Sequence, residues 1–366
     1  MNAMTSRQRI DAAFSHRQPD RTPIFEYVLL SPVADAVLGR RYADFGGDYA
    51  DWAAYAQEIG NYEAALRQYA RDRVDLARKL GHDMIYCVPN PPESVMEFRP
   101  QPPISAPPAE DPVENVRRRN EQRREALSRP DSSNPCLIYQ YLREEMDRQG
   151  LDLPLYTPAF SHGIWTDVEL METMLLEPET AHEHFALATE SCRRSIHRLA
   201  EAGADMIGIG GDFAGNRPLI SPAAYREFIA PELKGLSDQI HSLGCRAVNA
   251  SDGDLWSVID DFLLTSGVDA YGEIDFSAGM DLKKLKERFG QRITFFGNMD
   301  CGNTLSFSSP ETIREQTVRC IEDGMGNGGH VFTASNAISA SVPLSNYLAM
   351  VNAYRDYFCL PHFSIS

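Results

Sequence analysis

The chain has no long apolar segment, few basic residues and no paired cysteines, and each shortage excludes a class of protein. No stretch of its 366 residues approaches the roughly 18 consecutive apolar residues that a membrane-spanning helix needs. Acidic residues outnumber basic ones by 52 to 35, and the net charge of −17 argues against nucleic acid and anionic membranes as partners. The seven cysteines form no CxxC pair and the first residues include no apolar signal segment, so we expect reduced thiols and a cytoplasmic location.

The second half of the chain alternates short apolar segments with amphipathic ones. The amphipathic segments 221–244 and 309–325 each begin with a serine followed by a proline, which is typical of the first turn of a helix. Further helices are expected at 254–266, 281–290 and 344–358. The apolar segments have the composition of buried parallel strands and cover residues 205–212, 245–250, 269–275, 293–298 and 330–335.

The first half is less regular but follows the same alternation. Strands are expected at 21–29, 82–88 and 153–160, and helices at 62–80 and 169–203, the latter with a break near Pro178. Eight strand–helix units predict an α/β protein with a (β/α)8 TIM barrel, formed by residues 1–366 as a single domain. An open doubly wound sheet would need a glycine-rich phosphate loop after the first strand, and the sequence there, "IFEYVLLSP", has no glycine.

Residues 89–135 interrupt this alternation after the second strand. Their first part is rich in proline, which excludes regular helix, and their second part is highly charged and has the pattern of a solvent-facing helix. We interpret the segment either as a lid over the carboxyl-terminal mouth of the barrel or as a surface loop, and the sequence leaves both open.

The active site of such a barrel lies where the strands end at their carboxyl termini. Three carboxylates, Asp212, Asp252 and Glu273, follow neighbouring strands and should meet there. Like charges in one place raise at least one pKa unless a cation neutralises them, so the site should bind a cation, bind a divalent metal or keep a carboxylic acid protonated. Alternatively, aspartates at these junctions cap the next helix, as Asp254 and Asp300 also could. The further candidates at strand ends are Tyr27, Tyr86, Asn90, His162, Trp165, Phe213, Asn216, Cys301 and Asn336.

His162 has two interpretations that the sequence does not separate. A histidine at a strand end can act as a general acid or base, because its ordinary pKa is near neutrality. It can equally be a loop histidine that hydrogen-bonds to the backbone.

Several segments together resemble the uroporphyrinogen decarboxylase superfamily. They are "TSRQRIDAAFSHRQPDRTPIF", "DMIGIGGD", "SPAAYREFIAPELK", "DGDLW" and "FGNMD", and they extend over nearly the whole chain. The superfamily contains porphyrinogen decarboxylases and zinc-dependent methyltransferases that serve cobalamin or coenzyme M. The resemblance implies a (β/α)8 barrel and a homodimer.

The sequence departs from both branches of that superfamily. Where the decarboxylases carry an arginine-rich motif, only Arg40 and Arg41 are basic, and asparagines, Asn90 and Asn336, stand where an aspartate and a histidine are expected. The His-x-Cys zinc ligands of the methyltransferases fall on Ala250 and Asp252. A thiolate-bound zinc is therefore not expected, whereas Asp212, Asp252 and Glu273 could still hold a metal through oxygen.

The leading hypothesis is methyl transfer from a small methoxylated or methylamine-type donor to a corrinoid protein. Asp252 and Glu273 would be the acid or the metal ligands, and Asp212 and His162 would position the substrate. Trp165, Tyr27 and Tyr86 could contact a cationic donor through their rings, and the remaining strand-end candidates would line the site. No tightly bound cofactor is expected, because the partner would supply the corrinoid. The alternatives are a decarboxylase of a porphyrinogen or a smaller acid, and a non-catalytic binding protein.

Overall fold

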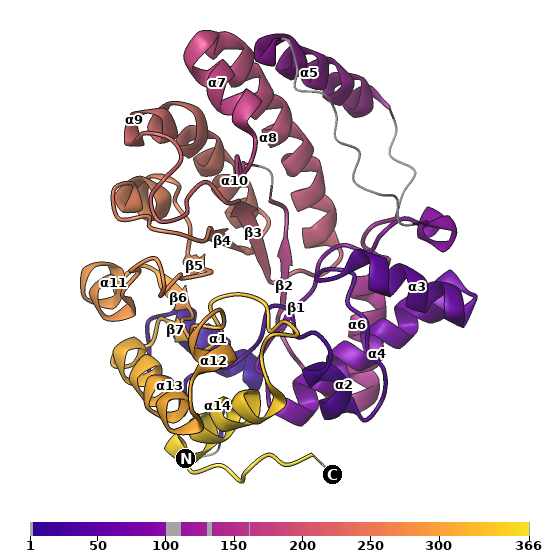
Figure 1. The fold of residues 1–366 in the computed structure, drawn as a ribbon, viewed down its shortest axis with the longest axis vertical. Helices are drawn as coiled ribbons and strands as arrows, with labels where there is room; N and C mark the ends of the chain where they lie inside the picture. Colours follow the sequence, from indigo (N-terminus) through magenta and orange to yellow (C-terminus); the bar gives the residue numbers. More distant parts are fainter. Residues whose placement is uncertain (1–2, 100–110, 130–133, 161, 366) are drawn as a thin grey trace.

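The centre of the molecule is a parallel sheet surrounded by helices (Figure 1). The computed structural model describes residues 3–99, 111–129, 134–160 and 162–365. Seven strands pair in the order of the sequence, each parallel to the next. They are β1 Ile85–Tyr86, β2 Leu155–Pro158, β3 Met206–Gly210, β4 Arg246–Ala250, β5 Ala270–Gly272, β6 Thr294–Phe296 and β7 His330–Val331.

The segment 23–30 connects the two edges of this sheet. Ile24 forms a parallel bridge with Phe332 and Leu29 forms one with Ile338, both just beyond β7. On its other side, the backbone carbonyl of Ile24 accepts a hydrogen bond of 2.7 Å from the N–H of Asp83, just before β1. The predicted first strand is therefore present as isolated bridges, and the curled parallel sheet is consistent with the predicted TIM-like barrel.

The helices that flank the strands largely match the predicted ones. The break predicted near Pro178 separates α7 from α8, because proline is tolerated in a first helical turn and not in a helix interior. No described helix is both long and apolar enough to cross a membrane. The larger helices are α3 Tyr49–Ile59, α4 Tyr62–Leu80, α6 Leu137–Gln149, α7 Val168–Leu176, α8 Pro178–Glu201, α10 Ala230–Ser242, α11 Leu282–Phe289, α13 Pro310–Gly324 and α14 Leu344–Tyr357. The short ones are α2 Val33–Leu38, α9 Pro222–Ala224 and α12 Thr304–Phe307.

Two predicted helices differ from the structure. The helix expected at 221–244 passes through a π-helical turn, Tyr225–Ile229, before α10, because Pro231 has no N–H to donate to the preceding turn. The helix expected at 254–266 is wrong in its first half. There the side chain of Asp254 accepts a hydrogen bond of 2.9 Å from the N–H of Trp256 and closes a turn, so helical structure begins only at residues 259–260 and continues as the π-helical turn Asp261–Thr265.

A helix that the sequence did not assign, α1 Ser6–Phe14, packs against the strands near their amino-terminal ends. The Phe14 ring meets Phe296 of β6 edge-on with 5.9 Å between centroids. The carbonyl of Ala13 accepts a hydrogen bond of 2.9 Å from the N–H of Gly329, one residue before β7. This helix therefore helps to fill the end of the sheet opposite the predicted active site.

The predicted lid, residues 89–135, lies partly outside the described residues, which omit 100–110 and 130–133. Its described part includes α5 Pro112–Ser128, which packs on α7 and α8 (Figure 1). Arg117 pairs with Glu177 at 2.5 Å and Arg119 pairs with Asp167 at 3.0 Å. Few side chains of α5 are buried, so ionic contacts hold much of this helix in place.

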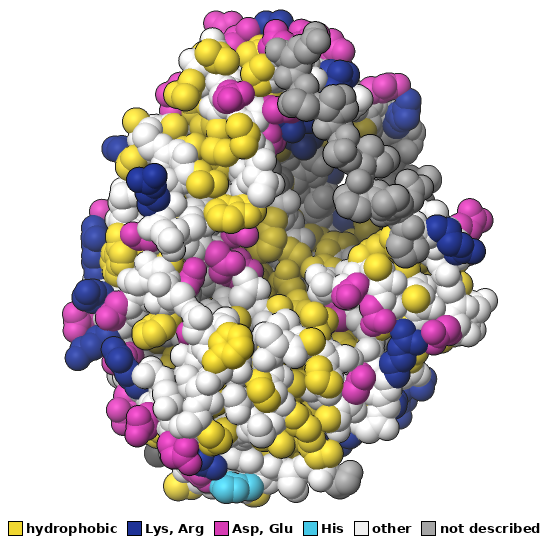
Figure 2. All heavy atoms as spheres, viewed as in Figure 1, with side chains coloured by type: hydrophobic (Ala, Val, Ile, Leu, Met, Phe, Trp, Pro, Cys, Tyr) yellow, Lys and Arg dark blue, Asp and Glu magenta, His cyan; other side chains and the backbone are white. Residues whose placement is uncertain are grey.

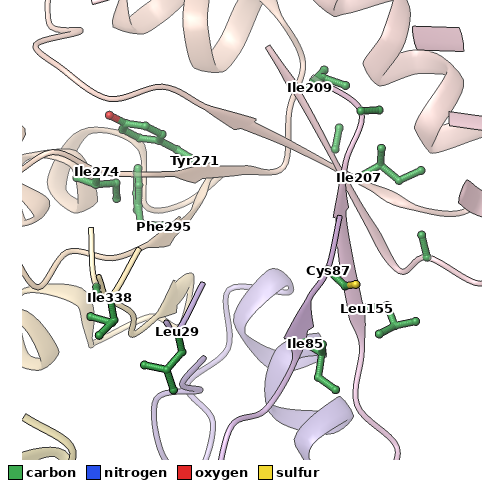
Figure 3. Close-up of a cluster of buried hydrophobic side chains, with 14 of the residues drawn as sticks. Leu29, Ile85, Cys87, Leu155, Ile207, Ile209, Tyr271, Ile274, Phe295 and Ile338 are labelled. Carbon is green, nitrogen blue, oxygen red and sulfur yellow. The ribbon is translucent and has the colours of Figure 1, made fainter. Parts of the chain in front are cut away.

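Apolar side chains occupy both faces of the strands, as a parallel sheet requires. The cluster between strands and helices includes Ile85, Leu155 and Ile207, and Figure 3 shows these side chains beside the strands that carry them. The second cluster lies on the other face and includes Met84, Tyr86, Tyr156, Met206, Val248 and Phe296. Alternation along β1, with Met84 and Tyr86 on one face and Ile85 and Cys87 on the other, produces this division.

Three tyrosine rings fill the interior cluster toward the active-site end. Tyr27 lies 5.0 Å from Tyr86 and 5.7 Å from Tyr156, and Tyr86 lies 5.0 Å from Tyr156, all measured between ring centroids. Glycines on the facing strands make room for two of the rings. A Cβ at Gly272 would lie 2.0 Å from the Tyr27 hydroxyl, and one at Gly208 would lie 2.7 Å from the Phe160 ring and 3.0 Å from the Tyr156 hydroxyl.

We expect Gly272→Ala to lower the free energy of unfolding by about 2 kcal/mol, because the new methyl group overlaps the Tyr27 hydroxyl. The loss should shrink when the same substitution is made together with Tyr27→Phe, which removes the overlapping oxygen. Gly302→Ala is the matched control, since its nearest neighbour would be 3.6 Å away. Urea unfolding of the two single glycine variants, the Tyr27→Phe variant, the double variant and the parent measures the effect. Equal losses with and without the Tyr27 hydroxyl would contradict the assignment.

Candidate functional site

Two aspartates lie together beyond the ends of β3 and β4. Asp252 is two residues beyond Ala250, the last residue of β4, in phase with the inward-facing Val248. Its backbone N–H donates a hydrogen bond of 3.0 Å to Oδ1 of Asp212, which follows β3 by two residues. The contact joins the Asp252 backbone to the Asp212 carboxylate and brings the two residues together across neighbouring strands, as the sequence predicts.

Two further polar side chains complete this group. The Nδ2 of Asn336, beyond β7, donates to Oδ2 of Asp252 at 2.8 Å. Asp275 accepts hydrogen bonds from the N–H groups of Gly253 at 3.2 Å and of Ala278 at 3.0 Å. Residues from four strand ends therefore converge around Asp252.

Glu273 reaches the group through an unusual backbone conformation. It follows β5 directly and has a φ of 63°, a left-handed value that is uncommon for residues other than glycine. The next residue, Ile274, packs into the outer cluster, so the turn at Glu273 interrupts the alternation of the strand. The Glu273 carboxylate accepts no hydrogen bond among the contacts of the described residues.

The shared location raises the pKa of two of these carboxyl groups. Burial, followed by the charges of Asp212 and Asp275, raises the pKa of Asp252 to about 7, even though the bond from Asn336 opposes the shift. Burial and the charges of Asp252 and Asp212 raise the pKa of Glu273 to about 8. The group therefore holds a carboxylic acid near neutral pH.

The face of the molecule that Figure 2 shows is hollowed near its centre. Figure 2 shows acidic side chains at the edge of this hollow, near the ends of β4 and β5, and hydrophobic side chains on its floor. Burial, followed by the proximity of Tyr156 and of Glu273, raises the pKa values of Tyr27 and Tyr86 well above normal. The arrangement thus places a protonated carboxyl group beside a buried cluster of tyrosines.

The predicted metal site gains no support from this geometry. Among the residues that the structure describes, which include Asp212, Asp252 and Glu273, no three His, Cys, Asp or Glu side chains are arranged to hold a metal ion. Thiolate and imidazole donors are also missing from this carboxylate group, so it does not fit the zinc that the family resemblance implies.

His162 does not join the carboxylates. Its Nε2 lies 2.9 Å from Oγ1 of Thr189 on α8, and its ring stacks on Phe185 with 6.1 Å between centroids. Burial lowers the pKa of His162 to about 4, so the ring is neutral at physiological pH. These contacts favour the structural interpretation of this histidine over the acid–base one.

Two other candidates have structural partners of their own. Asn90 is buried, donates to the Tyr62 hydroxyl at 2.9 Å and accepts from the N–H of Ile138 at 3.0 Å. Phe213 is buried and packs on Tyr225 with 4.8 Å between ring centroids. These contacts tie Asn90 and Phe213 to neighbouring elements, and Asn90 also lines a pocket with Tyr62 and Leu137.

The remaining candidates lie nearer the surface. Trp165 is half-exposed and Asn216 is exposed, both on loops beyond the strands. Cys301 is partly buried, its Sγ lies 3.5 Å from Oγ of Ser335, and burial raises its thiol pKa, which disfavours the reactive thiolate. Asp300 caps the turn after β6, where it accepts hydrogen bonds from the N–H groups of Gly302, Asn303 and Thr304, as the alternative interpretation predicts.

Tyr156 and the residues that fix the tyrosine floor were not predicted from the sequence. Tyr156 belongs to β2, and alternation along the predicted strand could have placed it inside. Arg73 of α4 is buried, pairs with Asp44 at 3.3 Å and donates to the carbonyl oxygens of Tyr27, at 3.2 Å, and Tyr86. No local pattern indicates this role, because the partners of Arg73 lie in distant parts of the chain.

We expect Glu273→Gln to stabilise the protein more at high pH than at low pH. The raised pKa means that the folded protein keeps a proton that the unfolded chain releases between about pH 4.5 and 8. The contribution of this group to stability is complete below that window and is lost as the pH rises through it. Glutamine does not titrate, so the gain in free energy of unfolding over the parent should be about 2 kcal/mol larger at pH 8 than at pH 5.

Urea unfolding at the two pH values tests this expectation. Glu172→Gln, at an exposed position of α7, is the matched control and should show no such difference. The same gain at both pH values would contradict the burial of an acidic group at Glu273.

Known proteins resemble this chain in sequence. The model of the family named "Uroporphyrinogen decarboxylase (URO-D)" matches residues 166–357. A uroporphyrinogen decarboxylase from Azoarcus sp. is 26% identical over 251 residues, which cover 63% of this chain and 66% of the relative. One from Nitrosomonas europaea is 28% identical over 190 residues, which cover 50% of each chain. The matched region thus spans between half and two thirds of these relatives.

A solved structure shows the same fold. The structure of a methyltransferase from Methanosarcina mazei superposes with a TM-score of 0.67 over 97% of this chain and 99% of that one, at 17% sequence identity. Both chains therefore share one architecture from end to end, including the segments outside the family match.

Proposed function

This chain belongs to the uroporphyrinogen decarboxylase family, and from that premise we propose that it transfers a methyl group from a small methoxylated or methylamine-type donor to a corrinoid carried by a partner protein. The observation that carries the proposal is the carboxylic acid that Asp252 and Glu273 hold at the mouth. The protein from Methanosarcina mazei that shares this fold is a methyltransferase, which supports the same reaction class. The family membership itself indicates an enzyme.

The carboxyl groups assist the departure of the group that loses its methyl. When the bond from the methyl carbon to the donor oxygen breaks, the electron pair stays on the oxygen, and the oxygen takes the proton of Asp252 or Glu273. The corrinoid would supply a reduced cobalt nucleophile that accepts the methyl group. Asn336 and the N–H of Asp252 keep the carboxyl groups of Asp252 and Asp212 in place during this step.

The charges around the site disfavour a decarboxylase of polycarboxylate substrates. Arg40 pairs with Asp72 and Asp75, and Arg41 pairs with Asp51 and Glu58, so both arginines are engaged away from the acidic group. A substrate with many carboxylates would meet the charges of Asp212 and Asp275 at the mouth without these cations to offset them. The relatives' activity, decarboxylation, is therefore the alternative outcome of the test.

We expect purified protein to demethylate a methoxylated or methylated amine donor in the presence of cob(I)alamin. Asp252→Asn and Glu273→Gln should each slow the reaction by about 10²-fold, because each removes a transferable proton. The rate of the parent should fall as the pH rises past about 8, where Glu273 loses its proton. Glu172→Gln should retain the parent rate.

Product analysis by mass spectrometry, with porphyrinogen and small acids as further substrates, completes the assay. Release of carbon dioxide without methyl transfer would favour the decarboxylase. Binding of donors without any turnover, over the whole panel, would favour a non-catalytic binding protein.

A further inference from the structure

We infer that Glu26 is a positioning residue, whose carboxylate holds residues 333–337 beside the segment 23–30 and thereby keeps Asn336 against Asp252. Glu26 is buried in the segment 23–30 and does not itself reach the acidic group. The inference deepens the proposed function and rests on it for its catalytic meaning, because Asn336 binds a carboxyl group that can give up the proton.

The segment 23–30 and the chain beyond β7 differ in length between their two bridges. Phe332 pairs with Ile24 and Ile338 pairs with Leu29, so the chain beyond β7 contains one residue more between these bridges. Backbone hydrogen bonds join the two segments at each bridge, with N···O distances between 2.8 and 3.2 Å. An extra residue of this kind interrupts the ladder and turns the side chains beside it, as in a β-bulge.

The Glu26 side chain takes the role of a backbone acceptor where the ladder is interrupted. Its Oε2 accepts a hydrogen bond of 3.2 Å from the N–H of Ala334 and another of 3.2 Å from the hydroxyl of Thr333. Both donors belong to fully buried residues, so the N–H would otherwise be unpaired away from water. The opposite side of the segment pairs regularly, since the N–H of Met299 donates to Thr333 at 3.1 Å and that of Ser335 donates to Met299 at 2.8 Å. Glu26 therefore fixes the side that faces away from β6.

Asn336 links this segment to the acidic group. Its Nδ2 donates to Oδ2 of Asp252 at 2.8 Å, and its Oδ1 accepts from the N–H of Ala337 at 2.6 Å. The backbone of Asn336 lies two residues beyond Ala334, which Glu26 holds directly. A shift of the segment would therefore move Nδ2 away from the carboxylate of Asp252.

The bond from Asn336 acts on the proton of Asp252. A hydrogen bond donated to a carboxylate favours its charged form, whereas burial and the charges of Asp212 and Asp275 favour the protonated form and raise the pKa of Asp252 to about 7. The neighbouring Glu273 also feels the charge of Asp252. Displacement of Asn336 would therefore raise the pKa of Asp252 further.

The role of Glu26 requires an acceptor oxygen and no particular charge. Burial raises the pKa of Glu26 to about 7, against the opposing bonds from Ala334 and Thr333. Oε2 accepts these bonds in the charged form and equally as the carbonyl oxygen of the acid. Glutamine should therefore replace Glu26, with its carbonyl oxygen in the place of Oε2. The titratable side chains around Glu26, from α4, the turn before β1, the loop after β6 and α14, are Arg73, His82, Cys301 and Tyr347.

Nuclear magnetic resonance on the free protein tests this role without a methyl donor or a corrinoid. Nitrogen labelling of asparagine reports the Nδ2 protons of Asn336, which are identified by their absence in Asn336→Ala. Labelling of the aspartate carboxyl carbon reports the titration of Asp252, which is identified through Asp252→Asn. The test variants are Glu26→Met, which removes the acceptor, Glu26→Asp, which shortens its reach, and Glu26→Gln, which keeps it.

Glu26→Met and Glu26→Asp should speed the exchange of the bonded Nδ2 proton of Asn336 with solvent by about tenfold and raise the titration midpoint of Asp252 by about half a pH unit. Glu26→Gln should keep both at the values of the parent. Asn336→Ala should raise the midpoint by about one pH unit, because it removes the bond to the charged form altogether. Adding Glu26→Met to Asn336→Ala should raise it no further, since Glu26 acts through Asn336.

Asn120→Leu is the matched control for a general loss of stability. The amide of Asn120 is also buried and donates a hydrogen bond of 3.1 Å to the carbonyl of Thr180, but it lies on α5. Its loss should lower the free energy of unfolding and leave the signals of Asn336 and Asp252 unchanged.

Four results would overturn the inference. They are an Asn336 exchange rate that Glu26→Met and Glu26→Asp leave unchanged, the same change in the Asn120→Leu control, a failure of Glu26→Gln to keep the parent values, and a further rise in the double variant. If Glu26→Met does not fold, Glu26→Asp supplies the same comparison. Because no substrate is present, a failed methyl-transfer assay would overturn the proposed function and leave the positioning role of Glu26 intact.

Discussion

Burial and mutual repulsion among carboxylates determine the protonation of the acidic group at the ends of the strands. Asp212, Asp252 and Glu273 follow three successive strands. Because those strands pair in parallel, the three residues lie at the same edge of the sheet. The first two are joined by a backbone hydrogen bond, and Asn336 steadies Asp252 from beyond β7. Three ionised groups are costly there, so protons remain bound near neutral pH. Capping a helix does not require carboxyl groups with raised pKa values, so the arrangement indicates a functional site.

The floor of the site depends on contacts that lie farther away. Arg73 binds the carbonyl oxygens of Tyr27 and Tyr86 and is itself compensated by Asp44, whose carboxylate also accepts from the Tyr42 and Tyr69 hydroxyls. Additional hydrogen bonds offset the cost of burying an ion pair, and here the Arg73 Nη atoms and both carboxylate oxygens of Asp44 are bonded. The network ties the backbone of segment 23–30 at Tyr27 to that of β1 at Tyr86, and so holds the two tyrosines that carry these carbonyl groups.

Much of this could be predicted from the sequence, and the failures have identifiable causes. Alternating segments placed the strands to within a few residues, and the rule that barrel sites lie at strand ends brought Asp212, Asp252 and Asn336 together correctly. The rule failed for His162 and Phe213, since a residue just past a strand can turn either toward the mouth or toward the helices. The sequence also could not reveal the left-handed backbone at Glu273 or the partners of Arg73, because both depend on contacts between distant segments.

The residues that stabilise the fold and those of the acidic group lie at opposite ends of the strands. At one end α1 packs its Phe14 on Phe296, and Arg9 and Arg21 pair with the buried Asp83. At the other end Glu273 adopts a left-handed backbone, and burial beside two aspartates raises the pKa of its carboxyl group to about 8. Strained backbone and crowded carboxyl groups reduce the free energy of unfolding, and the well-packed end can offset that loss. A ligand that accepts the proton of this group or offsets its charge therefore also relieves the crowding, so binding and proton transfer have one physical origin.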